Sequence, residues 1–229
     1  MFTIENFKLG EILLVDKPQT WTSFDVVNKL RYVISRKTGK IKVGHAGTLD
    51  PMATGLLIIC TGKKTKALDS IQAEEKEYTG TLQLGAVTAS YDADTAQENQ
   101  KPFTHITAEE IHKATKRFLG NILQTPPIYS AIKINGVKAY DLARDNQKPD
   151  MPPRQVEIFE FEISNVNLPF VDFKIHCSKG TYVRSLVHDL GQTLGCGAFM
   201  TALRRTQSGS FRIENAWNLQ DLIKEIENL

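Results

Sequence analysis

The chain has 229 residues, of which 41% are apolar and 24% are charged, and its formal net charge is +2. This composition is that of an ordinary globular protein, and it excludes collagen-like, coiled-coil and intrinsically disordered chains. The longest apolar run, Leu56 to Cys60, is far shorter than the roughly 18 residues that a spanning helix needs. The N-terminus carries no secretory signal, so we expect a cytoplasmic protein without a membrane segment.

Positive charge is concentrated in the N-terminal part of the chain. Between Lys29 and Lys66 there are nine basic residues and a single acid, Asp50. Such a block attracts polyanions such as RNA, because each neutralised phosphate releases counterions. A solvated helix face would have the same composition, so charge alone leaves both interpretations open.

The three cysteines, Cys60, Cys177 and Cys196, lie far apart and form no C-x-x-C pair. They indicate reduced thiols in a cytosolic protein. The histidines show no spacing typical of a metal site, and we therefore expect neither a metal nor a redox cofactor.

The first 84 residues predict alternating strands and helices around one glycine-rich loop. The predicted elements are a strand at 11–15, a helix at 23–37, a structured loop at 42–55, a buried strand at 56–61, a helix at 65–72 and a strand at 77–84. Ser23 is the expected N-cap of the first helix. The loop is where we expect functional groups, because loops on a rigid scaffold carry most binding and catalytic residues.

The rest of the chain predicts an exposed polar segment at 91–104 and a projecting hairpin insertion at about 124–153. The other predicted elements are helices at 107–119, 182–194 and 219–226 and strands at 156–166, 170–177 and 199–204. No βαβ rhythm is present. The fold class expected is α+β, with a central mixed, mostly antiparallel sheet flanked by helices, in one domain spanning residues 1–229.

Asp50 is the only carboxylate between residues 26 and 65, and it lies in the glycine-rich loop. Gly44, Gly47 and Gly55 permit a tight backbone path and close approach of a ligand. This arrangement suits a catalytic carboxylate, but it equally suits an Asx-type turn in which Asp50 merely caps the residues after it.

Residues 44–57, G-H-A-G-T-L-D-P-M-A-T-G-L-L, resemble the catalytic motif of the TruB family of tRNA pseudouridine synthases. Four more family-like segments follow the family's order: L-L-V-D-K-P at 13–18, K-E-Y-T-G at 76–80, G-T-Y-V-R-S-L at 180–186 and L-R-R-T-Q-S-G at 203–209. The resemblance implies the pseudouridine synthase fold. It also implies isomerisation of uridine 55 in the T-loop of tRNA, with the base flipped out and without metal or redox cofactor.

The resemblance implies three catalytic residues. Asp50 is the essential carboxylate, which either attacks C1′ or removes the 2′ proton to give a glycal. Tyr78 stacks on the target base near C5, and Arg184 pairs with the catalytic carboxylate. Without the family, Tyr78 would be a packing residue of a strand and Arg184 an exposed residue at a helix start.

Five further residues match substrate-binding positions of the family. His45 fills the stack that the flipped base leaves, and Tyr182 and Leu203 line the pocket. Lys17 and Lys66 contact phosphate or position a loop. Each of these residue types is also common in purely structural roles.

The insertion at 124–153 corresponds to a family segment that closes on the RNA stem-loop. Its Lys133, Lys138 and Arg144 suit phosphate contacts, although they are equally explained by solvent exposure. The chain stops 18 residues after Phe211, so no C-terminal PUA domain is expected. The expected partner is the tRNA T stem-loop, bound by a monomer without guide RNA or protein partner.

Two other functions remain open from the sequence. One is a non-catalytic tRNA-folding chaperone or RNA-binding module, and the other is a related synthase acting on ribosomal RNA. Substitution of Asp50 separates the first from catalysis, and substrate mapping separates the second.

Overall fold

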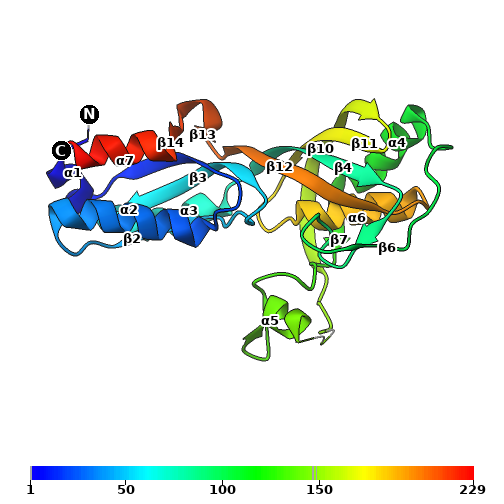
Figure 1. Ribbon diagram of the computed structural model, residues 1–229, viewed down its shortest axis with the longest axis horizontal. Helices are drawn as coiled ribbons and strands as arrows, with labels where there is room; N and C mark the ends of the chain where they lie inside the picture. Colours follow the sequence, from blue (N-terminus) through cyan, green and yellow to red (C-terminus); the bar gives the residue numbers. More distant parts are fainter. Residues whose placement is uncertain (1, 146, 148) are drawn as a thin grey trace. The chain divides into compact units, whose positions relative to one another are not determined.

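The computed structural model describes residues 2–145, 147 and 149–229, and the chain folds into two compact units (Figure 1). Unit one combines the N-terminal part of the chain, up to Tyr78, with Leu203–Leu229, and unit two is Thr79–Ala202. Strands β4 (Lys76–Leu84) and β12 (Ala198–Ser208) contribute to both units. The predicted α+β class, with a mixed sheet flanked by helices, is confirmed.

Unit one is built on the strand order β14–β1–β3–β12, in which β1 and β3 are antiparallel and β3 and β12 are parallel. Strand β2 pairs with β3, and β13 pairs with β12. The elements are α1 (Ile4–Leu9), β1 (Ile12–Lys17), α2 (Ser23–Thr38), β2 (Val43–Ala46), β3 (Thr54–Thr61), η1 (Gly62–Ala67), α3 (Leu68–Ala73), β13 (Phe211–Arg212), η3 (Ile213–Asn215), β14 (Trp217–Asn218) and α7 (Leu219–Glu227).

Both faces of β3 are buried, which explains its unbroken apolar run. One face presents Leu57 and Ile59 to a core built from α1, α2 and α7. The opposite face presents Leu56 and Ile58 to a smaller cluster that includes Ile71 of α3. A strand buried on both faces forms a rigid base for the loop that precedes it.

Two details of the predicted N-terminal elements were wrong. The N-cap of α2 is Thr22, whose hydroxyl accepts from the Asp25 N–H while Asp25 accepts from the Thr22 N–H, a capping box. Ser23 lies inside the helix and is buried. The predicted loop at 42–55 contains β2, because residues 43–46 pair with residues 58–61 of β3.

Unit two has the strand order β12–β4–β11–β10–β7, with β10 antiparallel to both β11 and β7. Helix α4 packs against β10 and α6. The elements are β5 (Val87–Thr88), β6 (Gln97–Glu98), α4 (Ala108–Thr115), η2 (Lys116–Phe118), β7 (Gly120–Gln124), β8 (Lys133–Ile134), β9 (Val137–Lys138), α5 (Ala139–Arg144), β10 (Arg154–Asn167), β11 (Phe170–Cys177) and α6 (Val183–Thr193).

The predicted hairpin is present as β8 and β9, which pair with each other in a separate two-stranded sheet. Asn135 and Gly136 have φ of 51° and 87°, the left-handed conformation that a two-residue hairpin turn requires. The short helix α5 follows directly. Residues 146 and 148 of the predicted insertion lie outside the described residues.

The segment at 91–104 was predicted to be exposed, and this prediction was wrong for part of it. Asp92 is 1% exposed, and residues 97–98 form β6 with β5. The three cysteines are buried free thiols. Within the described ranges, no helix is long and apolar enough to cross a membrane.

Candidate active site

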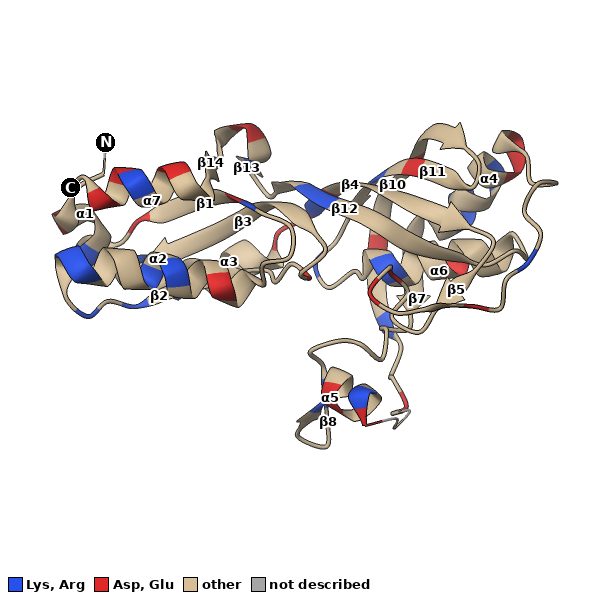
Figure 2. Ribbon diagram, viewed as in Figure 1, with Lys and Arg blue, Asp and Glu red and all other residues tan. Residues whose placement is uncertain are grey.

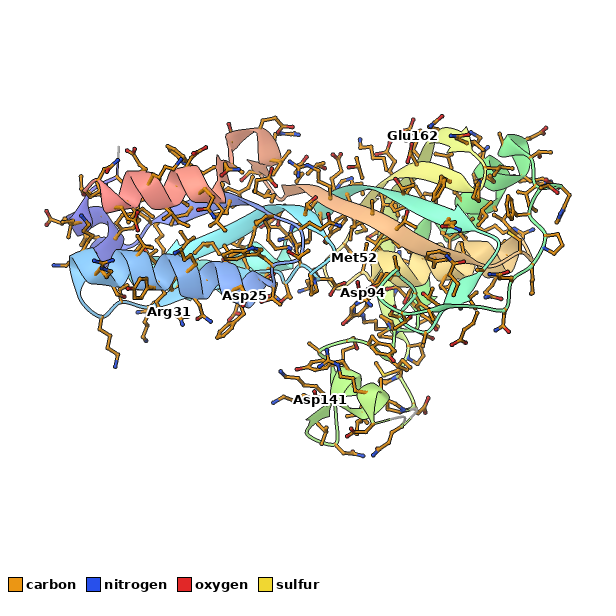
Figure 3. The ribbon with its side chains drawn as sticks, viewed as in Figure 1. Asp25, Arg31, Met52, Asp94, Asp141 and Glu162 are labelled. Carbon is orange, nitrogen blue, oxygen red and sulfur yellow. The ribbon has the colours of Figure 1, made fainter. Side chains whose placement is uncertain are left out.

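Asp50 lies in a tight turn directly before β3. The Asp50 carbonyl accepts from the Ala53 N–H at 3.1 Å, which closes the turn. Leu49 and Ala53 are buried on either side, whereas Asp50 is half-buried and Pro51 is exposed. Figure 3 labels Met52 in this turn. The two buried neighbours fix the turn to the core, and Asp50 stays partly accessible to solvent.

Side chains from the preceding elements hold the backbone of this turn. The Ser23 hydroxyl donates to the Leu49 carbonyl at 3.1 Å and accepts from the Leu49 N–H at 2.8 Å. The Thr20 N–H donates to the Pro51 carbonyl at 2.9 Å. Thr20 has φ of 71°, which a β-branched residue rarely adopts, so this contact is made from a strained turn.

Lys17 is fully buried beneath the same turn. Its Nζ donates to the carbonyls of Pro18 at 2.9 Å, Trp21 at 2.6 Å and Pro51 at 3.4 Å. Burial lowers the pKa of Lys17 from 10.5 to about 8, and attraction to Asp50 and then Asp25 opposes this decrease. Lys17 therefore ties the strand β1 to the turn and places a positive charge near Asp50.

Arg205 of β12 holds the other end of the motif. It is 1% exposed and donates from Nε to the Leu56 carbonyl at 2.7 Å and from Nη2 to the Gly47 carbonyl at 2.9 Å. Gly55 has φ of 99°, and a Cβ there would lie 2.3 Å from the Arg205 carbonyl oxygen. Only glycine permits β3 and β12 to approach this closely.

His45 lies on β2, and its Nε2 is 3.1 Å from the Thr48 hydroxyl. Burial lowers the pKa of His45, and the positive charge of Arg205 lowers it further. Both effects favour the neutral form of the imidazole.

The remaining predicted residues of unit one lie on three separate elements. Tyr78 is 9% exposed on β4, and Leu203 is 8% exposed on β12, where its carbonyl accepts from the Thr54 hydroxyl. Lys66 is exposed on η1. Arg204, next to Leu203, forms a bidentate pair with Asp16 at 3.0 and 2.7 Å.

Arg184 is buried in the first turn of α6 in unit two. Its Nη1 is 3.2 Å from Asp92 Oδ2 and donates to the Ser90 carbonyl, and its Nη2 donates to the Tyr129 carbonyl. Both side chains of this ion pair are almost fully excluded from water. Arg184 and Asp50 belong to different units, and their predicted pairing stays a prediction.

Tyr182 is the N-cap residue of α6 and is half-buried. Its backbone N–H and carbonyl are both bound by the side-chain amide of Gln124, at 2.7 and 3.0 Å. The guanidinium of Arg154 lies 4.4 Å from the centroid of the Tyr182 ring. The backbone of Tyr182 is thus held from β7, and its ring is held from β10.

The structure brings three of the predicted site residues, His45, Asp50 and Lys17, to one motif in unit one. Arg205 and Ser23 were not predicted to belong to the site. Arg205 stands inside the family-like block at 203–209, but its type and position did not distinguish it from Arg204. Asp92 was missed because it lies in the segment at 91–104, which was predicted to be polar and exposed. Among the described residues, no group of three or more His, Cys, Asp or Glu side chains could hold a metal.

Comparison with known families gives two matches. Residues 35–183 match the model for the N-terminal domain of TruB family pseudouridylate synthases, and residues 184–228 match that for the tRNA pseudouridylate synthase B C-terminal domain. The chain belongs to the TruB family. It is therefore a pseudouridine synthase, an isomerase.

Individual TruB relatives align over almost the whole chain. The chain is 49% identical to tRNA pseudouridine synthase B of Flavobacterium johnsoniae, over 93% of this chain and 95% of that protein. It is 48% identical to the protein of the same name from Phocaeicola vulgatus, over 97% and 99%. A relative from Clostridium tetani is 47% identical, with 95% of this chain covering 74% of that protein.

Two solved structures share the fold of this chain. The chain matches a structure titled as a Cbf5–Nop10–Gar1 complex with a TM-score of 0.75 and 29% identity, over 97% of this chain. It matches an archaeal box H/ACA sRNP Nop10–Cbf5 complex with a TM-score of 0.71 and 26% identity. The chain spans 56% and 57% of the matched chains.

Proposed function

We propose that this chain isomerises uridine 55 in the T-loop of tRNA to pseudouridine, with Asp50 as the essential carboxylate. The observation that carries the proposal is the turn around Asp50, whose backbone is held by side chains from β1, α2 and β12 inside a family motif. The names of the two relatives that align over 95% and 99% of their length support tRNA as the substrate class. The family model at 35–183 spans parts of both units, which supports treating them as one catalytic domain.

The reaction is an internal rearrangement. The C1′–N1 bond breaks, the uracil rotates, and C1′ bonds to C5, which loses its hydrogen while N1 gains one. The atoms balance without an oxidant, a reductant or a metal. A carboxylate suits this chemistry because it either traps the electron-poor C1′ as a covalent adduct or removes the 2′ proton.

Lys17 and Ser23 act here through the backbone of the turn. They hold the peptide units on both sides of Asp50, so the carboxylate needs little reorganisation when the substrate arrives. Arg205 holds the Gly47 end of the same motif. In this proposal, all three are positioning residues.

The other proposed roles concern the flipped base, the carboxylate of Asp50 and the phosphates of the RNA. Tyr78 stacks on the flipped uracil, Leu203 and Tyr182 line its pocket, and His45 fills the space left in the T-loop. Arg184 orients the carboxylate of Asp50. Lys66 is exposed and available for phosphate, whereas Lys17, buried among three carbonyls, positions the loop.

The test uses tRNA transcript carrying 5-³H-uridine, because the hydrogen at C5 must leave as water when C5 bonds to C1′. We expect release by the wild type, and loss of release both with Asp50→Asn and with a transcript in which uridine 55 is replaced. Asn nearly preserves the shape of Asp but is neither a nucleophile nor a base. Thr48→Ser, an exposed position in the same motif, is the matched control and should stay active.

Other outcomes identify the alternatives. Tight tRNA binding without release by the wild type would contradict the enzyme proposal and leave a tRNA-folding chaperone. Release that persists after replacement of uridine 55 would place the target elsewhere in the RNA. Release by Asp50→Asn at the wild-type rate would remove Asp50 from the chemistry.

A further inference from the structure

The first turn of α6 holds both ends of the hairpin insertion, which we define as residues 125–153. The insertion leaves β7 after Gln124 and rejoins β10 at Arg154. These two residues are direct cross-strand partners in the β7–β10 ladder. Both strands thus enter the insertion at the same level, beside the segment that carries Tyr182 and Arg184.

The entry side is fixed through three contacts with α6. The buried amide of Gln124 binds the N–H and the carbonyl of Tyr182. The Ser185 hydroxyl donates to the Thr125 carbonyl at 2.8 Å, and Arg184 Nη2 donates to the Tyr129 carbonyl at 3.1 Å. Tyr182, Arg184 and Ser185 therefore hold the end of β7 and the first residues of the insertion.

The exit side of the insertion is fixed by contacts of Arg154. Its guanidinium stacks on the ring of Tyr182 at 4.4 Å and donates to the Gly180 carbonyl. A guanidinium over an aromatic ring gains from the negative face of the ring, and its planar fork keeps donors for a carbonyl. Tyr182 is consequently held by its backbone from one end of the insertion and by its ring from the other.

These contacts exceed what closing a sheet requires. An apolar residue at 124 would fill the buried position, whereas an amide that satisfies both polar groups of one peptide fixes the location of that residue. Arg184 adds a direct link, because the guanidinium that binds Asp92 also binds the Tyr129 carbonyl. A shift of the insertion must either move the turn at 182–185 with it or break these hydrogen bonds.

We propose that Gln124 and Arg154 form a clamp that sets the position of Tyr182 when the hairpin insertion engages tRNA. The proposal rests on the function proposed above, in which Tyr182 and Arg184 serve the reacting base. Gln124 and Arg154 are positioning residues, since they act through Tyr182. Binding of the RNA by the insertion and progress of the reaction are coupled through this clamp.

The experiment separates binding from the reaction in the full-length chain. Single-turnover tritium release is measured at saturating enzyme, and the tRNA Kd is measured by filter binding. Arg154→Met keeps the length of the side chain and removes the cation, and Gln124→Met removes the amide at the other end. Gln155→Met, at the exposed neighbouring position on β10, is the matched control.

We expect both clamp variants to release tritium about 10- to 100-fold more slowly at saturation, because small misplacements of site groups cost about this much. The tRNA Kd should stay within about 2-fold, since the basic residues of the insertion are untouched. Arg154→Lys, which keeps a cation over the ring, should recover part of the rate. Thermal midpoints are measured to check that each variant is folded at the assay temperature. Arg154 is only half-buried, so its substitution should be tolerated and this side of the clamp is testable.

A wild-type rate at saturation in both variants would overturn the clamp, as would a loss confined to tRNA affinity. Equal losses in Arg154→Met and Arg154→Lys that follow the thermal midpoints would reduce Arg154 to a structural residue. If the wild type itself releases no tritium, the proposed function fails and the clamp fails with it. Wild-type release that is lost only in Asp50→Asn leaves the function standing and contradicts the clamp alone.

Discussion

The turn around Asp50 and the hairpin formed by β8 and β9 are both short and partly exposed, but they are held in different ways. The turn is bound by side chains from residues far away in the sequence, among them Lys17, Ser23 and Arg205. The hairpin pairs with itself, and its basic side chains cluster locally, with Lys138 and Arg144 both near the Tyr140 ring. Figure 2 shows basic residues in blue next to acidic residues in red on α5.

The difference matches the tasks proposed for the two regions. A carboxylate that reacts with one carbon atom needs a fixed position, which long-range hydrogen bonds provide. A surface that meets a long, irregular polyanion gains from exposed basic side chains that reach several phosphates. Long-range anchoring is therefore concentrated at the turn where the chemistry is proposed to take place.

The largest expected effect comes from Gly55→Ala, which disturbs the packing of β3 against β12 directly after the Asp50 turn. Its Cβ would lie 2.3 Å from the Arg205 carbonyl oxygen, at a φ that alanine disfavours. We expect the free energy of unfolding to fall by about 3 to 5 kcal/mol, measured by denaturant titration. Gly39→Ala, with a similar φ but open space around it, is the control and should cost about 1 kcal/mol. Equal costs at the two positions would show that packing against β12 is unimportant.

Ser23→Ala tests the link between α2 and the turn. It leaves the buried N–H and the carbonyl of Leu49 without the hydroxyl, which should lower the free energy of unfolding by about 2 kcal/mol. We also expect a rate of tritium release about 10- to 100-fold lower at saturation, because Asp50 is adjacent. Ser35→Ala, half-buried on the same helix, should change neither quantity. An unchanged rate in Ser23→Ala would mean that the turn holds its geometry without this anchor.

Lys17 gives the turn a dependence on pH. Its pKa is about 8 in the folded chain against 10.5 as the ordinary value, so between these pH values the unfolded chain binds more protons. The contribution of Lys17 to the free energy of unfolding therefore rises with pH across this window, by up to about 3 kcal/mol in total. The free energy of unfolding of the wild type minus that of Lys17→Met, measured by denaturant titration from pH 7 to pH 10.5, should increase with pH. A constant difference would contradict the burial of a charged Lys17.

The smallest effects are expected from the hairpin. Lys133→Ala, Lys138→Ala and Arg144→Ala should each weaken tRNA binding modestly and reduce the slope of log K against log salt by about 1 where a phosphate contact is lost. The rate of release at saturation should not change. Lys113→Ala on α4 is exposed and serves as the control. A loss of rate without a loss of affinity would show that the hairpin takes part in the chemistry.

The sequence predicted most elements because their patterns are local. The N-cap of α2 was assigned to Ser23 although Thr22 and Asp25 have the spacing of a capping box, so this signal was available. Strand β2 was missed because it is short and contains Gly44, and only pairing with β3 defines it.

The site was predicted in part for a similar reason. Asp50 is marked by its motif, whereas Arg205 and Asp92 acquire their roles from partners 158 and 92 positions away. Such pairings depend on the tertiary fold. The double contact of Gln124 with Tyr182 likewise joins residues 58 positions apart.

Hydrogen exchange with and without tRNA tests the contrast between the two regions most directly. In the free protein, the amides of Leu49 and Ala53 should exchange slowly, because they are bonded to Ser23 and to the turn itself. Amides at 130–145 should exchange fast in the free protein. Their exchange should become about 10-fold slower, or more, when tRNA binds. The contrary result is that, before tRNA is added, the amides of the turn exchange as fast as those of the hairpin, and that they slow only when tRNA binds. This result would show that the substrate, not the fold, positions Asp50.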